Sequence, residues 1–84
     1  MLTIKFFSLI REALDTEQMS LDWSQDVATV AQLKQSLIAE GGEHWSEVLN
    51  QPNLVQALNQ RVVFEDAAVA DGDEVAFFPP MTGG

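Results

Sequence analysis

The sequence contains no cysteine, and this absence removes several classes of chemistry. Without thiols the chain forms no disulfide, no thiolate metal site and no cysteine nucleophile. His44 is the single histidine, and one imidazole without a second metal ligand of its kind argues against a metal or nucleophilic site. Any sulfur that this protein handles must therefore be carried by a group other than cysteine.

Basic residues and long apolar runs are also scarce. The chain has four Lys and Arg residues and 13 Asp and Glu residues, which gives a net charge of −9. Nucleic-acid binding needs clustered basic side chains, so this balance argues against it. It suits a partner with a basic surface, although solubility alone explains the charge equally well. The chain has no run of about 18 apolar residues that would span a membrane. Its N-terminus lacks the basic region and the apolar stretch of a signal peptide. We therefore expect a cytoplasmic protein.

The 84 residues, 46% of them apolar, suffice for one domain with one core. Apolar alternation predicts strands at 2–7, 18–23 and 74–78, and a hairpin of 54–58 and 61–64 around Asn59-Gln60. In the second strand, the residues expected to face the core are Met19, Leu21 and Trp23, and the two tryptophans, Trp23 and Trp45, fit either the core or its rim.

Three helices are predicted between the strands. Ser8 is expected to cap a short helix that ends at residue 14 and turns Leu9, Ile10 and Ala13 inward. Thr29 with Gln32 fits a capping box for the main helix, whose apolar residues at helical spacing are Val30, Leu33, Leu37 and Ile38. Gly41-Gly42 should end it. A further short helix at 43–49 would bury Trp45, Val48 and Leu49.

This order predicts an α+β fold, a mixed sheet with one main helix packed across one face. The first and last strands are the most apolar, so we expect them to be central, parallel neighbours. Phe7 and Phe78 would then meet on the face away from the helix, with Arg11 nearby. Two adjacent exposed phenylalanines are typical of a protein interface; the alternative is that loops cover them.

The end of the chain is unusual. Pro79-Pro80 cannot extend a sheet ladder, so we predict a domain at 1–80 and a flexible tail at 81–84, Met81-Thr82-Gly83-Gly84. Glycines lack Cβ, so this tail can pass through a narrow channel. Ordering its residues costs roughly 4–8 kcal/mol, which a docking surface such as the aromatic pair must offset. The alternative is an ordinary disordered terminus.

The α-carboxylate of Gly84 is the most promising reactive group. It is ionised at neutral pH and a poor electrophile, so it needs activation, for example as an acyl-adenylate. The missing cysteines suit this chemistry, because no internal thiol can capture an activated terminus. Thr82 has no visible base beside it, and Asp71-Gly72-Asp73 lacks the spacing of a calcium loop and is predicted to be a turn.

Several segments together resemble the small subunits of molybdopterin synthase over the whole chain. They are Phe6-Phe7, Arg11-Glu12, Leu58-Asn59, the stretch 71–75, and the terminal block 77–84. The resemblance implies a β-grasp, ubiquitin-like fold. Asp15 departs from the pattern, since this family often has glycine there, but Asp tolerates the left-handed conformation well, so we expect the turn to survive.

The resemblance also implies a function. A ubiquitin-activating-type adenylyltransferase would adenylate Gly84 with ATP, and a sulfur donor protein would convert it to a thiocarboxylate. The tail would enter the large subunit, which holds the catalytic residues, and give sulfur to cyclic pyranopterin monophosphate for the molybdenum cofactor. The small subunit would bind no cofactor or metal itself. It would work in a heterotetramer of two small and two large subunits, and the implied partner contacts are Phe7, Arg11, Phe78, Pro79 and Pro80.

Three alternatives remain open at this stage. A thiamine-type sulfur carrier uses the same activation but is usually shorter and lacks the Phe-Phe-Pro-Pro block. A ubiquitin-like modifier would instead join Gly84 to lysines of other proteins. A plain interaction module would have an inert tail, and deleting Gly83-Gly84 would leave its function intact.

Overall fold

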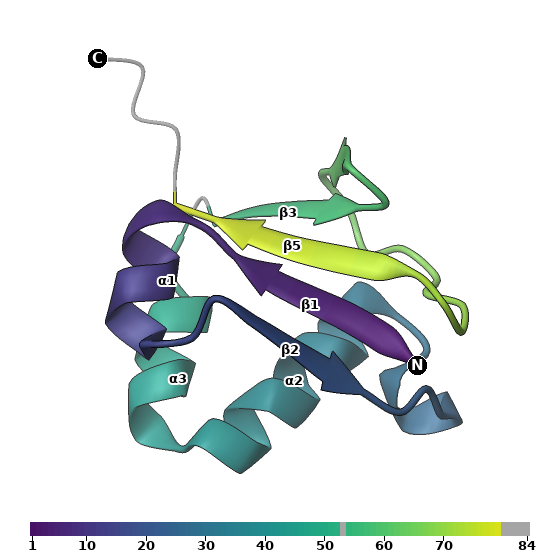
Figure 1. Ribbon diagram of the computed structural model, residues 1–84, viewed down its shortest axis with the longest axis horizontal. Helices are drawn as coiled ribbons and strands as arrows, with labels where there is room; N and C mark the ends of the chain where they lie inside the picture. Colours follow the sequence, from purple (N-terminus) through teal and green to yellow (C-terminus); the bar gives the residue numbers. More distant parts are fainter. Residues whose placement is uncertain (53, 80–84) are drawn as a thin grey trace.

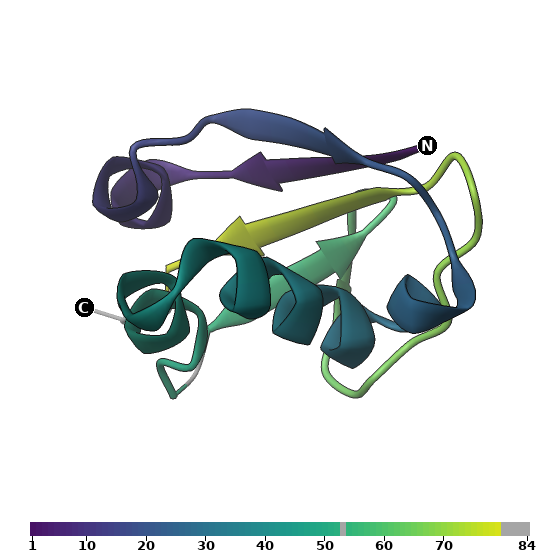
Figure 2. The ribbon, with the colours of Figure 1, turned by 90° about the horizontal axis from the view of Figure 1, so that it is seen from below.

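The protein is a five-stranded mixed sheet with α2 and α3 packed against one face (Figures 1 and 2). The computed structural model describes residues 1–52 and 54–79. In chain order the elements are β1 (Leu2–Phe6), α1 (Ser8–Leu14), β2 (Gln18–Leu21), a 3-10 helix (Gln25–Val27), α2 (Val30–Gly41), α3 (Glu43–Leu49), β3 (Val55–Leu58), β4 (Arg61–Val63) and β5 (Glu74–Phe78). This is the predicted α+β arrangement.

The two most apolar strands lie at the centre of the sheet. The strand order is β2-β1-β5-β3-β4, and β1 runs parallel to β5 with Ile4 opposite Val75 and Phe6 opposite Phe77. All other neighbours are antiparallel. Parallel strands end at the same edge, so β1 leads into α1 next to the point where β5 ends (Figure 1). The predicted central, parallel pair is confirmed.

The core fills the space between the sheet and the helices. Phe6 and Phe77 are fully buried there and stack at 5.9 Å between ring centroids, and Trp45 of α3 meets Phe6 edge-on at 5.5 Å. The other buried apolar residues of this cluster are Leu2, Ile4, Ile10, Leu14, Val27, Val30, Leu33, Leu37, Val48, Leu49, Val69 and Val75. Within the described residues no polar side chain is buried, so packing of apolar surface holds the scaffold together.

Three side chains accept hydrogen bonds from backbone N–H groups at the start of α2. Thr29 Oγ1 accepts from the backbone N–H of Gln32 at 3.1 Å, and Gln32 Oε1 accepts from that of Ala28 at 3.1 Å. The predicted Thr29–Gln32 capping is thus confirmed. Asp66 adds a contact from far along the chain, because its Oδ1 accepts from the N–H of Ala31 at 2.8 Å. This hydrogen bond to the helix is the main reason that the pKa of Asp66 is lowered from 3.8.

The glycine pair that ends α2 serves two needs. Gly42 has φ 84° and ψ −161°, a conformation that is essentially restricted to glycine. Gly41 lets the ring of Trp45 approach, because a Cβ added there would lie 2.2 Å from Trp45 Cγ. The predicted end of the helix is confirmed, and the close approach explains why both residues are glycine.

The prediction for α1 was wrong in two respects. Phe7, not Ser8, occupies the N-cap, and it makes no side-chain capping bond. Ile10 and Leu14 are the buried residues, whereas Leu9 is 67% exposed and Ala13 is exposed. Ile10 and Leu14 are four apart, but so are Leu9 and Ala13, so helical spacing alone did not show which of the two pairs faces the core. Asp15 ends the helix at φ 51°, so the left-handed turn expected at this aspartate is confirmed.

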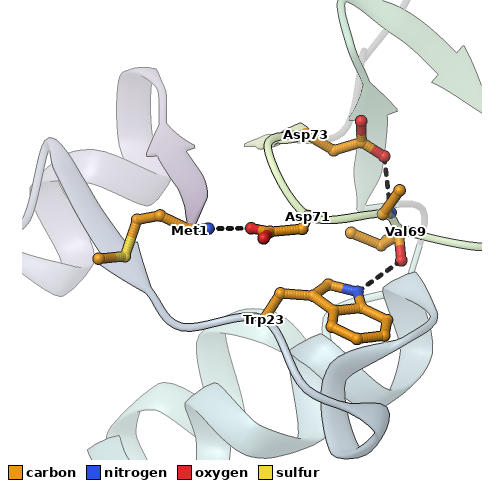
Figure 3. Close-up of polar contacts among 6 residues, drawn as sticks. Met1, Trp23, Val69, Asp71 and Asp73 are labelled. Carbon is orange, nitrogen blue, oxygen red and sulfur yellow. Dashed lines mark hydrogen bonds and ion pairs between the residues drawn. The ribbon is translucent and has the colours of Figure 1, made fainter.

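The prediction for the second strand also needs correction. β2 ends at Leu21, and Trp23 lies beyond it with 37% of its surface exposed. Its indole N–H donates to the carbonyl of Val69 at 2.8 Å (Figure 3). The indole N–H needs a hydrogen-bond partner when it leaves water, and this carbonyl supplies one at the rim of the core.

The same end of the molecule holds the turn that precedes β5. The ammonium group of Met1 pairs with Asp71 (Figure 3). Asp73 accepts hydrogen bonds from the N–H of Ala70 at 2.8 Å and from Asn59 Nδ2 at 3.0 Å. Both bonds lower the pKa of Asp73 from 3.8, and the bond from Ala70 has the larger effect. The turn predicted at residues 71–73 is confirmed, and it lies at the opposite end of β5 from Pro79.

The predicted hairpin joins β3 and β4. Asn59 and Gln60 have φ of 50° and 70°, as a two-residue turn with both central residues left-handed requires. Asn59 also binds the first residue of β5, because its Oδ1 accepts from the N–H of Glu74 at 2.9 Å. The strands are shorter than predicted, and Leu54 and Phe64 lie just outside them.

No helix among residues 1–52 and 54–79 is long and apolar enough to cross a membrane.

Candidate functional site

The candidate site lies where β1 and β5 end, at the root of the C-terminal segment. Pro79, the last described residue, is half-buried beside Phe78. The predicted tail residues Met81, Thr82, Gly83 and Gly84, together with Pro80, lie outside the described residues, and their roles stay predictions. The described part of the site is therefore the surface from which this segment starts.

Phe7 and Phe78 meet as the alternation predicted. Their ring centroids are 4.6 Å apart and the rings are nearly parallel, at 5°. The register explains this contact, because Phe6 is opposite Phe77 and the N–H of Phe7 donates to the Phe77 carbonyl at 3.1 Å. Each strand thus gives one phenylalanine to the core and the next one to the outer pair. Phe7 remains 36% exposed and Phe78 is half-buried, so loops do not cover the pair.

The backbone holds Phe7 at the junction of β1 and α1. Its φ of −122° and ψ of 152° are extended, and its carbonyl accepts from the N–H groups of Ile10 at 3.1 Å and Arg11 at 3.4 Å. The side chain is therefore presented from a fixed point between a strand and a helix, which limits the conformational entropy lost when a partner covers it.

Arg11 lies on α1, the helix that Phe7 precedes and that contacts β5 (Figure 1). It is exposed and forms no ion pair with any residue within 1–52 and 54–79. Its placement on the element next to the strand ends agrees with the prediction, and its proposed role as a partner contact stays a prediction.

Sequence reasoning missed other residues that share the face with Phe78. Val55 is opposite Phe78, and Ala57 is opposite both Ala76 and Val62. Facing residues of neighbouring strands lie on the same side of a sheet, so these side chains form one face, which we call the outer apolar face: Phe7, Val55, Ala57, Val62, Ala76 and Phe78. Ala57 and Ala76 are each only 4% exposed, so the larger side chains make up its accessible surface. The signal was present in the alternation of β3, where Val55 and Ala57 are separated by Gln56.

The β1 and β2 half of the same face is polar. Thr3 lies opposite Ser20, and Lys5 lies opposite Gln18. Lys5 also pairs with Glu74 at 3.1 Å between Nζ and Oε1. The uncovered side of the sheet is therefore divided into a polar half and an apolar half, and the apolar half is continuous with the end of β5.

The single histidine makes a contact between two helices. His44 Nε2 lies 2.6 Å from the Ala13 carbonyl, and because a carbonyl only accepts, this nitrogen carries the proton. The ring thereby links α3 to α1. No group of three or more His, Cys, Asp or Glu side chains placed to hold a metal ion occurs in the described part of the chain.

The sequence is similar to known sulfur carrier proteins along its length. The chain matches the model of the ThiS family over residues 4–84. It is 39% identical to the molybdopterin synthase sulfur carrier subunit of Escherichia coli (strain K12) and 38% identical to that of Haemophilus influenzae, over the full length of each protein. The predicted resemblance to molybdopterin synthase small subunits is confirmed.

Solved structures support the fold. SAMP1 from Haloferax volcanii superposes with a TM-score of 0.75 at 24% identity, over 99% of this chain and 98% of that one. A chain in the complex of subunits 1 and 2 of the molybdopterin-converting factor from Helicobacter pylori superposes with a TM-score of 0.65 at 20% identity, over 99% and 97%. The predicted β-grasp, ubiquitin-like fold is confirmed. By the match of its sequence over nearly its whole length, the chain belongs to the ThiS family.

Proposed function

We propose that this protein is the sulfur carrier subunit of molybdopterin synthase. The observation that carries the proposal is the 39% identity, end to end, with a protein of that name. The geometry supports it, because the apolar half of the sheet lies beside the root of the segment that ends in Gly83-Gly84. A carrier needs both a reactive terminus and a surface by which partners hold the body.

The reaction begins at the Gly84 carboxylate. A ubiquitin-activating-type adenylyltransferase joins it to the AMP portion of ATP and releases pyrophosphate. A sulfur donor protein then supplies the sulfur, AMP leaves, and the terminus becomes a thiocarboxylate. Because the chain has no cysteine, no thiol of its own competes for the activated carbonyl. The use of ATP also leads us to propose a cytoplasmic location.

The second stage takes place on the large subunit, in a complex of two small and two large subunits. The tail inserts into the large subunit's active site and transfers sulfur to cyclic pyranopterin monophosphate. This chain acts as a sulfur-donating co-substrate, and the catalytic residues lie on the partner. Phe7, Phe78, Arg11, Pro79 and Pro80 contact that partner in the proposed complex.

Docking explains how a short tail is held. Ordering residues 81–84 costs roughly 4–8 kcal/mol, which exceeds what two glycines, a threonine and a methionine readily recover alone. Covering the outer apolar face contributes about 25 cal/mol for each Å² of apolar surface removed from water. Binding of the folded domain thus supplies the free energy that offsets the entropy cost of ordering the tail in the active site.

Pyrophosphate exchange tests this proposal. The activating enzyme, ATP and labelled pyrophosphate are incubated with the full chain or with a chain that lacks Gly84. We expect exchange only with the full chain, while thermal unfolding of the two is the same, because the tail follows the last strand. Exchange that is absent with the full chain, or equally fast without Gly84, contradicts the proposal.

A further inference from the structure

One large aromatic side chain has no role in the fold. Phe64 is 95% exposed, far more than any other aromatic residue among those described. It follows the last residue of β4, and the chain bends at Phe64 and Glu65. An isolated apolar residue on a surface needs no explanation, so the question is whether Phe64 stands alone.

Phe64 comes directly after an apolar part of the sheet. Val62 of β4 is 50% exposed, lies opposite Ala57, and so belongs to the outer apolar face. β4 is the edge strand of the sheet, on the side away from β2, and it ends at Val63, after which the chain bends. One more pair in the register of β3 and β4 would set Phe64 opposite Val55 of the same face. Phe64 is therefore placed at the end of the edge strand, next to the apolar half of the sheet.

We propose that Phe64 is a peripheral anchor for the large subunit, inserted into an apolar pocket on that partner. This inference rests on the proposed function, since it assigns an additional contact to the same interface. The pocket should carry basic groups at its rim, because Glu65 beside Phe64 is exposed. The carboxylate of Asp66 is already occupied by the backbone N–H groups of Ala31 and Ala67, which leaves Glu65 as the acidic group available to the partner.

A second copy of this chain is a poorer occupant. Each copy carries a net charge of −9, and like charges oppose association. A partner with basic side chains around an apolar pocket gains from both the ring and the charge.

Calorimetric titration of the large subunit with Phe64→Ser tests the assignment. We expect binding weaker on the order of tenfold, as for an anchoring phenylalanine that loses its buried surface. Phe64→Leu keeps an apolar side chain and should recover part of the affinity. Gln35→Ser, at an exposed position on α2, is the matched control and should bind like the wild type. The melting temperature of Phe64→Ser should equal that of the wild type, because the ring packs against almost nothing.

The outcomes separate this inference from the proposed function. Unchanged affinity of Phe64→Ser, with clear loss in Phe78→Ala, overturns the anchor and leaves the sulfur carrier proposal standing. Failure of the wild-type chain to bind the large subunit at all contradicts the proposed function itself. A wild-type dimer in sedimentation velocity that Phe64→Ser abolishes, with unchanged binding to the large subunit, assigns the ring to a second copy and also overturns the anchor.

Discussion

Replacing Phe78 by alanine tests the docking surface most sharply. The substitution removes one ring of a pair that stacks at 4.6 Å and leaves Phe7 without its support. Phe78 is half-buried and Phe7 is 36% exposed in the free protein, so each ring still has apolar surface that a partner can cover. The change acts on the face away from the core, where Phe77 remains in place.

The exposed fractions of the two rings set the expected loss of binding free energy. Full burial of a phenylalanine contributes roughly 1.5–3 kcal/mol. About a third of Phe7 is left to be buried on binding, which is roughly 0.5–1 kcal/mol, and the half-buried Phe78 contributes no more than that. Loss of one ring and displacement of the other should therefore weaken binding by about 0.5–2 kcal/mol, or roughly 2- to 30-fold in Kd. The free energy of unfolding should fall by about 1.5–3.5 kcal/mol, because the variant loses the apolar area that Phe78 already buries in the free protein in addition to the aromatic pair.

The assay is titration of the purified large subunit well below the melting temperature of the variant. Gln35→Ser on α2 serves as the control away from the sheet face. An equal Kd for wild type and Phe78→Ala would refute the reasoning, since it would mean that the outer apolar face is not covered in the complex. Loss of affinity in the control as well would point to a general effect on folding instead.

Three further predictions concern the scaffold and the tail. Gly41→Ala should lower the free energy of unfolding by about 1–3 kcal/mol in urea titrations, because its Cβ would overlap Trp45; equal stability would show that the ring moves freely. Asp66 has a lowered pKa, so its contribution is complete above pH 3.8 and is lost as the pH falls through the lowered value. The stability gap between wild type and Asp66→Asn should shrink over that acid range, and a gap independent of pH would contradict this. Adding a tryptophan after Gly84 should abolish sulfur transfer to the pterin with the melting temperature unchanged, and normal transfer would rule out a threaded tail.

The sequence predicted the parts of the fold that depend on local chemistry. Period-two alternation identified β1 and β5, and the Thr29–Gln32 pair and Gly41-Gly42 marked the ends of α2. The stacking of Phe7 on Phe78 could also be predicted, because it follows from two parallel strands that end at one edge. These features require no knowledge of contacts beyond neighbouring strands.

Features set by tertiary contacts were missed. Nothing local to Trp23 shows that its N–H meets the carbonyl of Val69, or that the chain leaves the sheet after Leu21. The cap that Asp66 adds to α2 joins residues 35 apart in the sequence. The outer apolar face was not predicted for a similar reason, since Val55 comes to lie opposite Phe78, and Val62 opposite Ala57, only through the pairing of three strands.

In the proposed reaction the C-terminal carboxylate of Gly84 carries the sulfur. Intact mass spectrometry of the chain after incubation with the activating enzyme, ATP and a sulfur donor tests this role. We expect a mass increase equal to the replacement of one oxygen by one sulfur, which fragmentation assigns to Gly84. An unchanged mass, or a sulfur located anywhere else in the chain, would contradict it.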